Sequence, residues 1–78
     1  MSKEEVASIG ARLKQIRTHL GIKQNTMADT LGISAAHLSE IENGKSTPSA
    51  EIFLKIGKTY KISLDFLFPY SEHLVYRN

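Results

Sequence analysis

The sequence predicts an all-α fold, a compact bundle of five helices. Apolar residues recur at steps of three and four along much of the chain, as they do on one face of an α-helix. Capping and turn residues interrupt this pattern at intervals that leave short helices between them. The 78 residues are 41% hydrophobic, which is enough for one domain with a small core. We place this domain at residues 1–68 and a tail at 69–78.

The first predicted helix begins after Ser2 and runs to about Leu20. Ser2 and Glu5 have the spacing of a capping box, in which each side chain bonds the other residue's backbone N–H. Gly10 lowers helix propensity, which indicates close approach of a neighbouring element or a weak first turn. Gly21 ends the helix. The apolar stripe consists of Val6, Ile9, Leu13, Ile16 and Leu20.

Two short helices joined by a tight turn are predicted over residues 24–43. Gly32 suits the left-handed residue that ends a helix, because a side chain costs energy there. Ser34 can cap the next helix, and Ile33 between them is expected to turn inward. The inward-facing residues are Met27, Ala28, Leu31, Leu38 and Ile41. Such a pair can place its second helix in the major groove of DNA, although ordinary αα-hairpins have similar spacing.

Two more helices follow this pair. Ser49 is expected to cap a helix over residues 50–60, and Ile52 falls off its apolar stripe, where a polar residue is expected. The core positions of that helix are Phe53, Ile56 and Tyr60. Ile62 is expected to enter the core, and Ser63 to cap a final helix over residues 64–68.

Together these residues resemble the Cro/CI-like (XRE) helix–turn–helix family over about residues 9–68. The most specific part is the run Ile41-Glu42-Asn43-Gly44-Lys45. The other residues that carry the resemblance are Ile9, Gly10, Leu13, Gln24, Ala28, Gly32, Ile33, Ser34, Leu38, Pro48, Ser49, Lys55, Ile56, Ser63, Leu64 and Asp65. The resemblance implies a lambda-repressor-like domain that binds DNA through a recognition helix at about residues 35–43.

The resemblance also implies which residues face the DNA. The expected base-reading residues are Ser34, Ala35, Ala36, Ser39 and Glu40. The expected phosphate contacts are Lys23, Gln24, His37, Asn43, Lys45, Ser46 and Thr47. Alanine can touch a thymine methyl group but cannot make the paired hydrogen bonds that arginine makes to guanine. We therefore expect modest direct readout of bases and a larger contribution from DNA shape.

Further expectations concern how the helices are held together. In the resembling family, an arginine placed like Arg17 pairs with the glutamate placed like Glu42, although Arg17 could also contact phosphate. The family places Ser or Thr before Gln24, and Lys23 stands there instead, so a cap worth about 1 kcal/mol is missing.

The C-terminal region carries more aromatic surface than so small a monomer needs to expose, and the family often dimerises there. Leu67 is expected in the core, and the expected dimer interface is Phe66, Phe68 and Tyr70. The tail at 69–78 either adds to the dimer, folds back on the core or is disordered, and the sequence does not choose among these.

Charge and composition restrict the class of protein. The net charge of +2 is weak evidence for a nucleic-acid partner. We expect Arg12, Lys14, Lys55, Lys58 and Lys61 to be solvated surface charges. The chain has no cysteine, no apolar run of membrane-spanning length and no signal-peptide core. These features favour a cytoplasmic protein, and the resemblance implies a bacterial or phage protein that acts on the nucleoid.

The favoured function is therefore sequence-specific binding of double-stranded DNA by a small homodimeric regulator, a repressor on a pseudo-palindromic operator. The alternative is a protein-interaction module on the same fold, such as an antitoxin or an antagonist of a regulator, which would have a protein partner. An enzyme, a cofactor and a metal are not expected. The three histidines lack metal-ligand spacing, and no glycine-rich phosphate loop is present.

Overall fold

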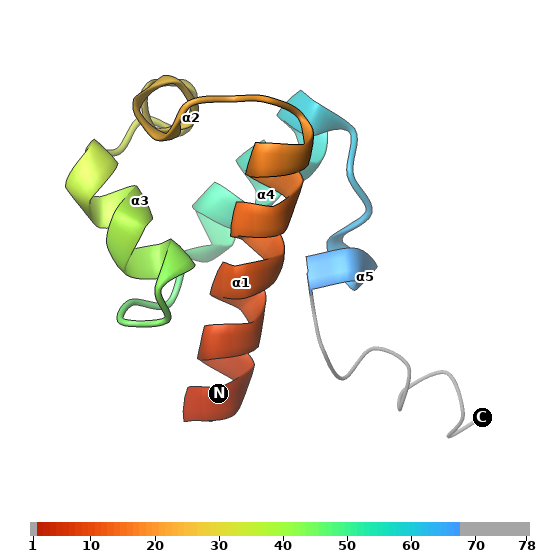
Figure 1. Ribbon diagram of the computed structural model, residues 1–78. Helices are drawn as coiled ribbons and strands as arrows, with labels where there is room; N and C mark the ends of the chain where they lie inside the picture. Colours follow the sequence, from red (N-terminus) through yellow and green to blue (C-terminus); the bar gives the residue numbers. More distant parts are fainter. Residues whose placement is uncertain (1, 68–78) are drawn as a thin grey trace.

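The computed structural model describes residues 2–67, which form five α-helices joined by turns, without a strand in that range. The helices are α1 (Lys3–His19), α2 (Gln24–Leu31), α3 (Ala35–Glu42), α4 (Ala50–Tyr60) and α5 (Leu64–Leu67). The all-α prediction is confirmed. In Figure 1, α2 and α3 lie on one side of the long helix α1, and α5 lies on the other. Phe68, Tyr70 and the rest of the predicted tail lie outside the described residues, so the predicted boundary at residue 68 stays a prediction.

The predicted capping box at the start of α1 is present. The Glu5 backbone N–H donates to Ser2 Oγ at 3.1 Å, and the Ser2 N–H donates to Glu5 Oε1 at 2.8 Å. The hydrogen bond from the Ser2 backbone is the main cause that lowers the pKa of the Glu5 carboxyl, and the Ser2 hydroxyl adds to it. The resulting stabilisation is present above the unfolded-state pKa and is lost as the pH falls through the lowered value.

Local signals also define the ends of α2, α3 and α4. Ser34 Oγ accepts from the His37 N–H at 3.0 Å, and Ser49 Oγ accepts from the Ile52 N–H at 3.2 Å. Gly32 ends α2 in the left-handed conformation, with φ at 74°. Lys23 precedes α2 and makes no side-chain cap, as its side chain predicts.

One core joins the five helices. Its buried hydrophobic residues are Ile9, Leu13, Met27, Ala28, Leu31, Leu38, Ile41, Ile52, Phe53, Ile56 and Leu67. Leu20 was placed in the apolar stripe of the first helix, and this prediction was wrong. The residue follows the last turn of α1, and its side chain is 49% exposed. The prediction for Ile52 was also wrong, since its side chain is only 6% exposed and α4 buries a wider face than the stripe indicated. Ile62 is half-buried at the edge of the core.

Two cations predicted to be solvated bind the backbone of other elements. Arg12 Nη1 donates to the Phe66 carbonyl oxygen at 2.8 Å, and its guanidinium carbon lies 5.7 Å from the centre of the Phe66 ring. Lys55 Nζ lies 3.4 Å from the Leu31 carbonyl oxygen, at the C-terminal end of α2, where a positive charge is favourable. Arg12 thus ties α5 to α1, and Lys55 ties α4 to α2.

Gly10 lets α1 approach the C-terminal end of α3. A Cβ at this position would overlap the Ile41 carbonyl oxygen and would lie 2.9 Å from that of Glu42. Gly44 makes a second close approach, because a Cβ there would lie 2.9 Å from Ala7 Cα. Gly44 also has φ at 76°, a conformation that side chains disfavour. The sequence-based expectation of a close neighbour at Gly10 is confirmed.

Replacing Gly10 with alanine tests this contact. On helix propensity alone, Gly10→Ala would stabilise α1 by about 1 kcal/mol. We expect instead a loss of about 1–3 kcal/mol, because the α3 backbone must move away from the added methyl group. Urea unfolding followed by circular dichroism measures the change. A gain in stability would mean that α3 can retreat without cost.

Candidate nucleic-acid interface

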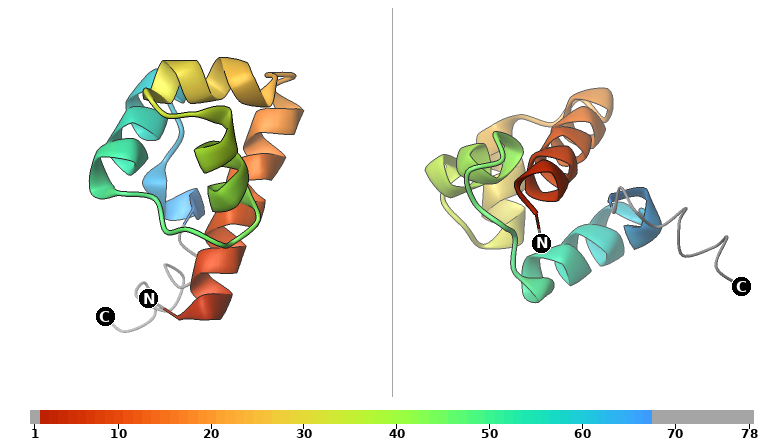
Figure 2. Two further views of the ribbon diagram at one scale, coloured as in Figure 1. Left: turned by 90° about the vertical axis from the view of Figure 1, so that its left-hand side faces the viewer. Right: turned by 90° about the horizontal axis from the view of Figure 1, so that it is seen from below.

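The two helices of the predicted helix–turn–helix pack closely, and α3 presents its outer side to solvent. The side chain of Ile33, in the turn between them, is half-buried against the core, while Leu38 and Ile41 are fully buried. In the left view of Figure 2, α3 faces the viewer, α2 crosses its upper end and the α3–α4 connection runs below it. The buried stripe of α3 therefore determines which of its residues remain available to a ligand.

Most of the predicted base-reading residues lie on this outer side. Ser34, Ala35, Ala36 and Glu40 are exposed, whereas Ser39 is half-buried. The Ser34 side chain is already engaged as the cap of α3, where its Oγ accepts from the His37 N–H. The outward surface of α3 thus combines small side chains near its N-terminal end with one carboxylate a turn further on.

Four of the residues predicted to contact DNA lie close together in two pairs, Asn43 with Ser39 and His37 with Glu40. Asn43 Nδ2 donates to Ser39 Oγ at 3.3 Å. His37 Nδ1 lies 3.6 Å from Glu40 Oε1, with both side chains partly exposed. His37 was expected to point toward a phosphate or toward Ile33, and the structure places it beside Glu40. Both pairs join polar side chains on or next to α3 that remain partly exposed.

The connection after α3 holds the remaining predicted phosphate contacts. Asn43, Lys45 and Thr47 are exposed, and Ser46 is half-buried. The Lys45 backbone N–H donates to the Glu40 carbonyl oxygen at 2.8 Å, which folds the chain back over the end of α3. Lys45 therefore stands next to the last turn of α3 with its side chain exposed.

The start of α2 supplies the other predicted cluster. Lys23 is exposed beside backbone N–H groups that no side chain caps, so positive charge and free donors coincide there. Gln24 is half-buried, and its Nε2 donates to Glu42 Oε1 at 3.0 Å. The structure therefore shows that Gln24 braces the last residue of α3.

Glu42 is the only buried charged or polar residue of the described chain, at 5% exposure. Arg17 Nε donates to Glu42 Oε2 at 2.7 Å, and Arg17 Nη2 donates to Glu42 Oε1 at 3.1 Å. The remaining Nη1 of Arg17 donates to the Ile22 carbonyl oxygen at 2.9 Å. The structure thus forms the Arg17–Glu42 ion pair that the sequence predicted. The family resemblance implied that Gln24 braces a residue of the recognition helix, and the structure identifies this residue as Glu42.

The described residues contain no group of three acidic or histidine side chains that could hold a metal ion. No helix within residues 2–67 is both long and apolar enough to cross a membrane.

The exposed cations Lys23 and Lys45 stand at the start of α2 and just after α3, with the small side chains of α3 between them in the chain. This arrangement suits a surface that meets a polyanion through the segments before and after the helix–turn–helix.

The chain matches the family model HTH_3, described as helix-turn-helix, over residues 13–67. It is 40% identical over 58 residues to the SPbeta prophage-derived uncharacterized HTH-type transcriptional regulator YonR of Bacillus subtilis (strain 168). That match covers 74% of this chain and 54% of the relative. The chain spans between 51% and 66% of the length of this and two other curated relatives.

Solved structures have the same fold. The restriction-modification controller protein C.AhdI from Aeromonas hydrophila superposes with a TM-score of 0.76 at 27% identity, covering 85% of this chain and 96% of that protein. The P22 c2 repressor protein, solved with a synthetic operator, gives a TM-score of 0.72 at 28% identity and covers 78% of this chain and 92% of that one.

A double-mutant cycle tests the buried network. Glu42→Leu should cost about 3–5 kcal/mol of unfolding free energy, because the Arg17 guanidinium loses its carboxylate inside the protein. Arg17→Met should cost a similar amount for the converse reason. The double variant should be more stable than the sum of the two losses predicts, since neither charge is then stranded. Urea unfolding measures all three, and additive losses would show that the two charges are not coupled.

Proposed function

Because the chain belongs to the helix-turn-helix family, we propose that it is a sequence-specific DNA-binding transcriptional regulator whose helix α3 enters the major groove. The main observation behind this proposal is that α3 exposes an outer side of small residues. The hydrogen bonds of Arg17 and Gln24 to the buried Glu42 fix the orientation of this helix. An α-helix with its side chains is about 10–12 Å across, which matches the major groove width of about 12 Å. The helix can therefore lie in the groove while α2 crosses the backbone.

Phosphate contacts would place the protein on the duplex from two segments next to α3. In the first, Lys23 and the uncapped N–H groups of α2 offer charge and donors to one phosphate cluster. In the second, Lys45 and Thr47 offer donors to another cluster. The Gln24 Nε2 group already donates one hydrogen bond to Glu42, which leaves one side-chain N–H for a phosphate, so we assign Gln24 mainly a bracing role. Such contacts determine register rather than sequence.

Sequence preference would come from few direct contacts. Ala35 and Ala36 can touch thymine methyl groups, and Glu40 can accept a hydrogen bond from the cytosine amino group. Because this surface lacks arginine and glutamine, the sequence-dependent shape of the DNA would contribute a large share of the discrimination. The sequence analysis led to the same expectation, namely modest direct readout of bases and a larger contribution from DNA shape.

We further propose repression by a homodimer on a pseudo-palindromic operator, with half-sites about 34 Å apart. Support comes from Phe66, which is 45% exposed on the last helix, and from the P22 c2 repressor, which has the same fold and was solved with its operator. Relatives from Bacillus and its phages support an action on the bacterial nucleoid, in the cytoplasm. The name of the Bacillus subtilis relative as a transcriptional regulator favours DNA binding over the interaction-module alternative.

Selection from a random pool of double-stranded DNA tests the proposal. We expect enrichment of an inverted repeat whose half-sites are about one helical turn apart. The variant Ala35→Arg with Ala36→Arg should enrich a different half-site, because arginine makes paired hydrogen bonds to guanine. The control, Ala11→Arg with Thr59→Arg, adds equal charge at exposed positions of α1 and α4 and should keep the original site. If Ala35→Arg with Ala36→Arg also kept it, α3 would not be the reading helix.

The salt dependence of binding tests the phosphate contacts separately. Lys45→Ala should weaken binding to all sequences by a similar factor and reduce the slope of log K against log salt by about one. Lys58→Ala serves as the control, because Lys58 is exposed in the last turn of α4 and outside the proposed contacts. Fluorescence anisotropy at several salt concentrations measures both slopes. Equal changes for the two variants would remove Lys45 from the interface.

A further inference from the structure

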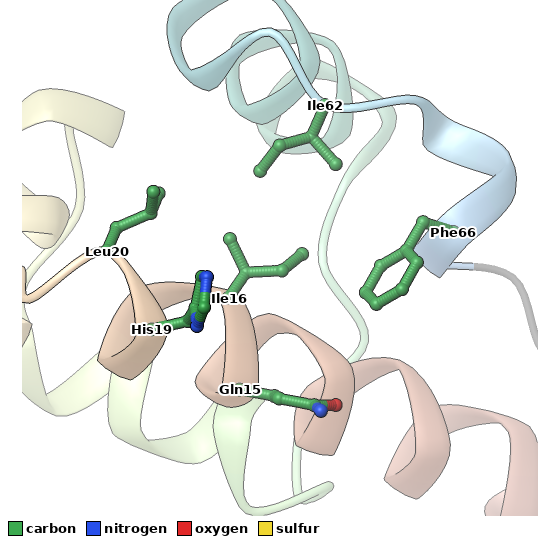
Figure 3. Close-up of a pocket in the computed structure, with 6 residues that line it drawn as sticks. All are labelled: Gln15, Ile16, His19, Leu20, Ile62 and Phe66. Carbon is green, nitrogen blue, oxygen red and sulfur yellow. The ribbon is translucent and has the colours of Figure 1, made fainter.

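An apolar groove lies between the end of α1 and the segment that carries α5. Its volume is about 410 Å³, within the range of about 300–1,000 Å³ typical of ligand sites. The residues that line it are Gln15, Ile16, His19, Leu20, Ile62 and Phe66. Figure 3 shows Leu20, Ile62 and Phe66 arranged around Ile16, with Gln15 and His19 along the α1 side.

The walls of this groove are held in place while exposing apolar surface. Arg12 fixes Phe66 by its hydrogen bond to the Phe66 carbonyl oxygen and by its position over the ring. The Leu20 backbone N–H donates to the Ile16 carbonyl oxygen at 2.9 Å, which fixes Leu20 at the end of α1. Two of the three exposed large hydrophobic residues in the described chain, Leu20 and Phe66, therefore stand on opposite walls of one groove. Burying these walls would be favourable.

We propose that the groove is the docking site of this chain's own C-terminal segment, with Leu74, Val75 and Tyr76 covering Ile16 and Leu20. The chain leaves the described structure directly after Phe66 and the buried Leu67, so the following eleven residues start at the rim of the groove. Leu74 is seven positions after Leu67, so the chain between them can span up to about 25 Å. The three consecutive apolar residues match the apolar walls.

Tethering favours the segment over a free ligand. A short covalent connection keeps it at an effective concentration in the millimolar range, so that even weak apolar contacts are sufficient for docking. The groove lies on the α5 side of α1, whereas α3 lies on the opposite side (Figure 1). A docked segment would therefore leave the proposed DNA-binding surface open. The segment would cover Ile16 and Leu20, while Phe66 on the opposite wall belongs to the proposed dimer interface. A second copy of the chain that fills the whole groove is the competing occupant.

Disulfide trapping in the 78-residue chain tests the proposal, because these residues include no cysteine. We would prepare Leu20→Cys with Val75→Cys and oxidise it at low protein concentration. A disulfide requires Cα atoms within about 7 Å, so rapid closure reports docking. The matched control is Leu54→Cys with Val75→Cys, since Leu54 is an apolar α4 residue outside the groove with 57% exposure. Mass and gel mobility identify the products.

We expect the 20–75 bridge to form within one chain at least ten times faster than the 54–75 bridge. In urea the order should reverse, because the 54–75 pair closes the shorter loop of an unfolded chain. His19→Cys with Val75→Cys repeats the test from the rim and leaves Leu20 intact. Covalent dimers as the main product would assign the groove to a second copy and overturn the proposal. Equal rates for the groove and control pairs in the folded chain would overturn it as well, and neither result depends on DNA binding.

Discussion

The buried carboxylate of Glu42 is the charge on which the arrangement of α1, α2 and α3 depends. It sits at the C-terminal end of α3 and accepts hydrogen bonds from Arg17 of α1 and Gln24 of α2. A buried carboxylate is costly unless it is paired and hydrogen-bonded, so any rotation of α3 that lengthened these bonds would be penalised. The network therefore stabilises one orientation of α3 relative to the rest of the molecule.

Close packing of α1 against α3 also fixes the orientation of α3. Gly10 brings the α1 backbone against the carbonyl groups of Ile41 and Glu42, at the same end of α3. Ion pairing and close approach thus act on one turn of the helix, while the opposite side carries Ala35, Ala36 and Glu40 in solvent. Residues that orient α3 and residues that would contact DNA are therefore different, and the outer set can change with little effect on stability.

Features that depend on neighbouring residues were predicted correctly. The capping box at Ser2, the caps at Ser34 and Ser49, and the left-handed Gly32 involve backbone groups no more than four positions away. The exposure of Ala35 and Ala36 followed from the position of the buried Leu38 and Ile41 on the same helix. The Arg17–Glu42 pair was different, since it came from the family resemblance and not from periodicity.

Features that depend on distant residues were decided only by the tertiary structure. Arg12 and Phe66 are 54 positions apart, and Lys55 and Leu31 are 24 apart, so nothing local shows that these cations bind backbone carbonyls. Leu20 was expected to be buried and is exposed, whereas Ile52 was expected to be exposed and is buried. Both predictions failed for the same reason, because burial depends on which element packs over a residue. The sequence alone determined the helices, their ends and the helix–turn–helix, through short-range hydrogen bonds and apolar spacing. The tertiary structure alone decided that Gln24 also bonds Glu42, that the neighbour of Gly10 is the end of α3, and that a groove lies beside Phe66, because helix packing creates these contacts.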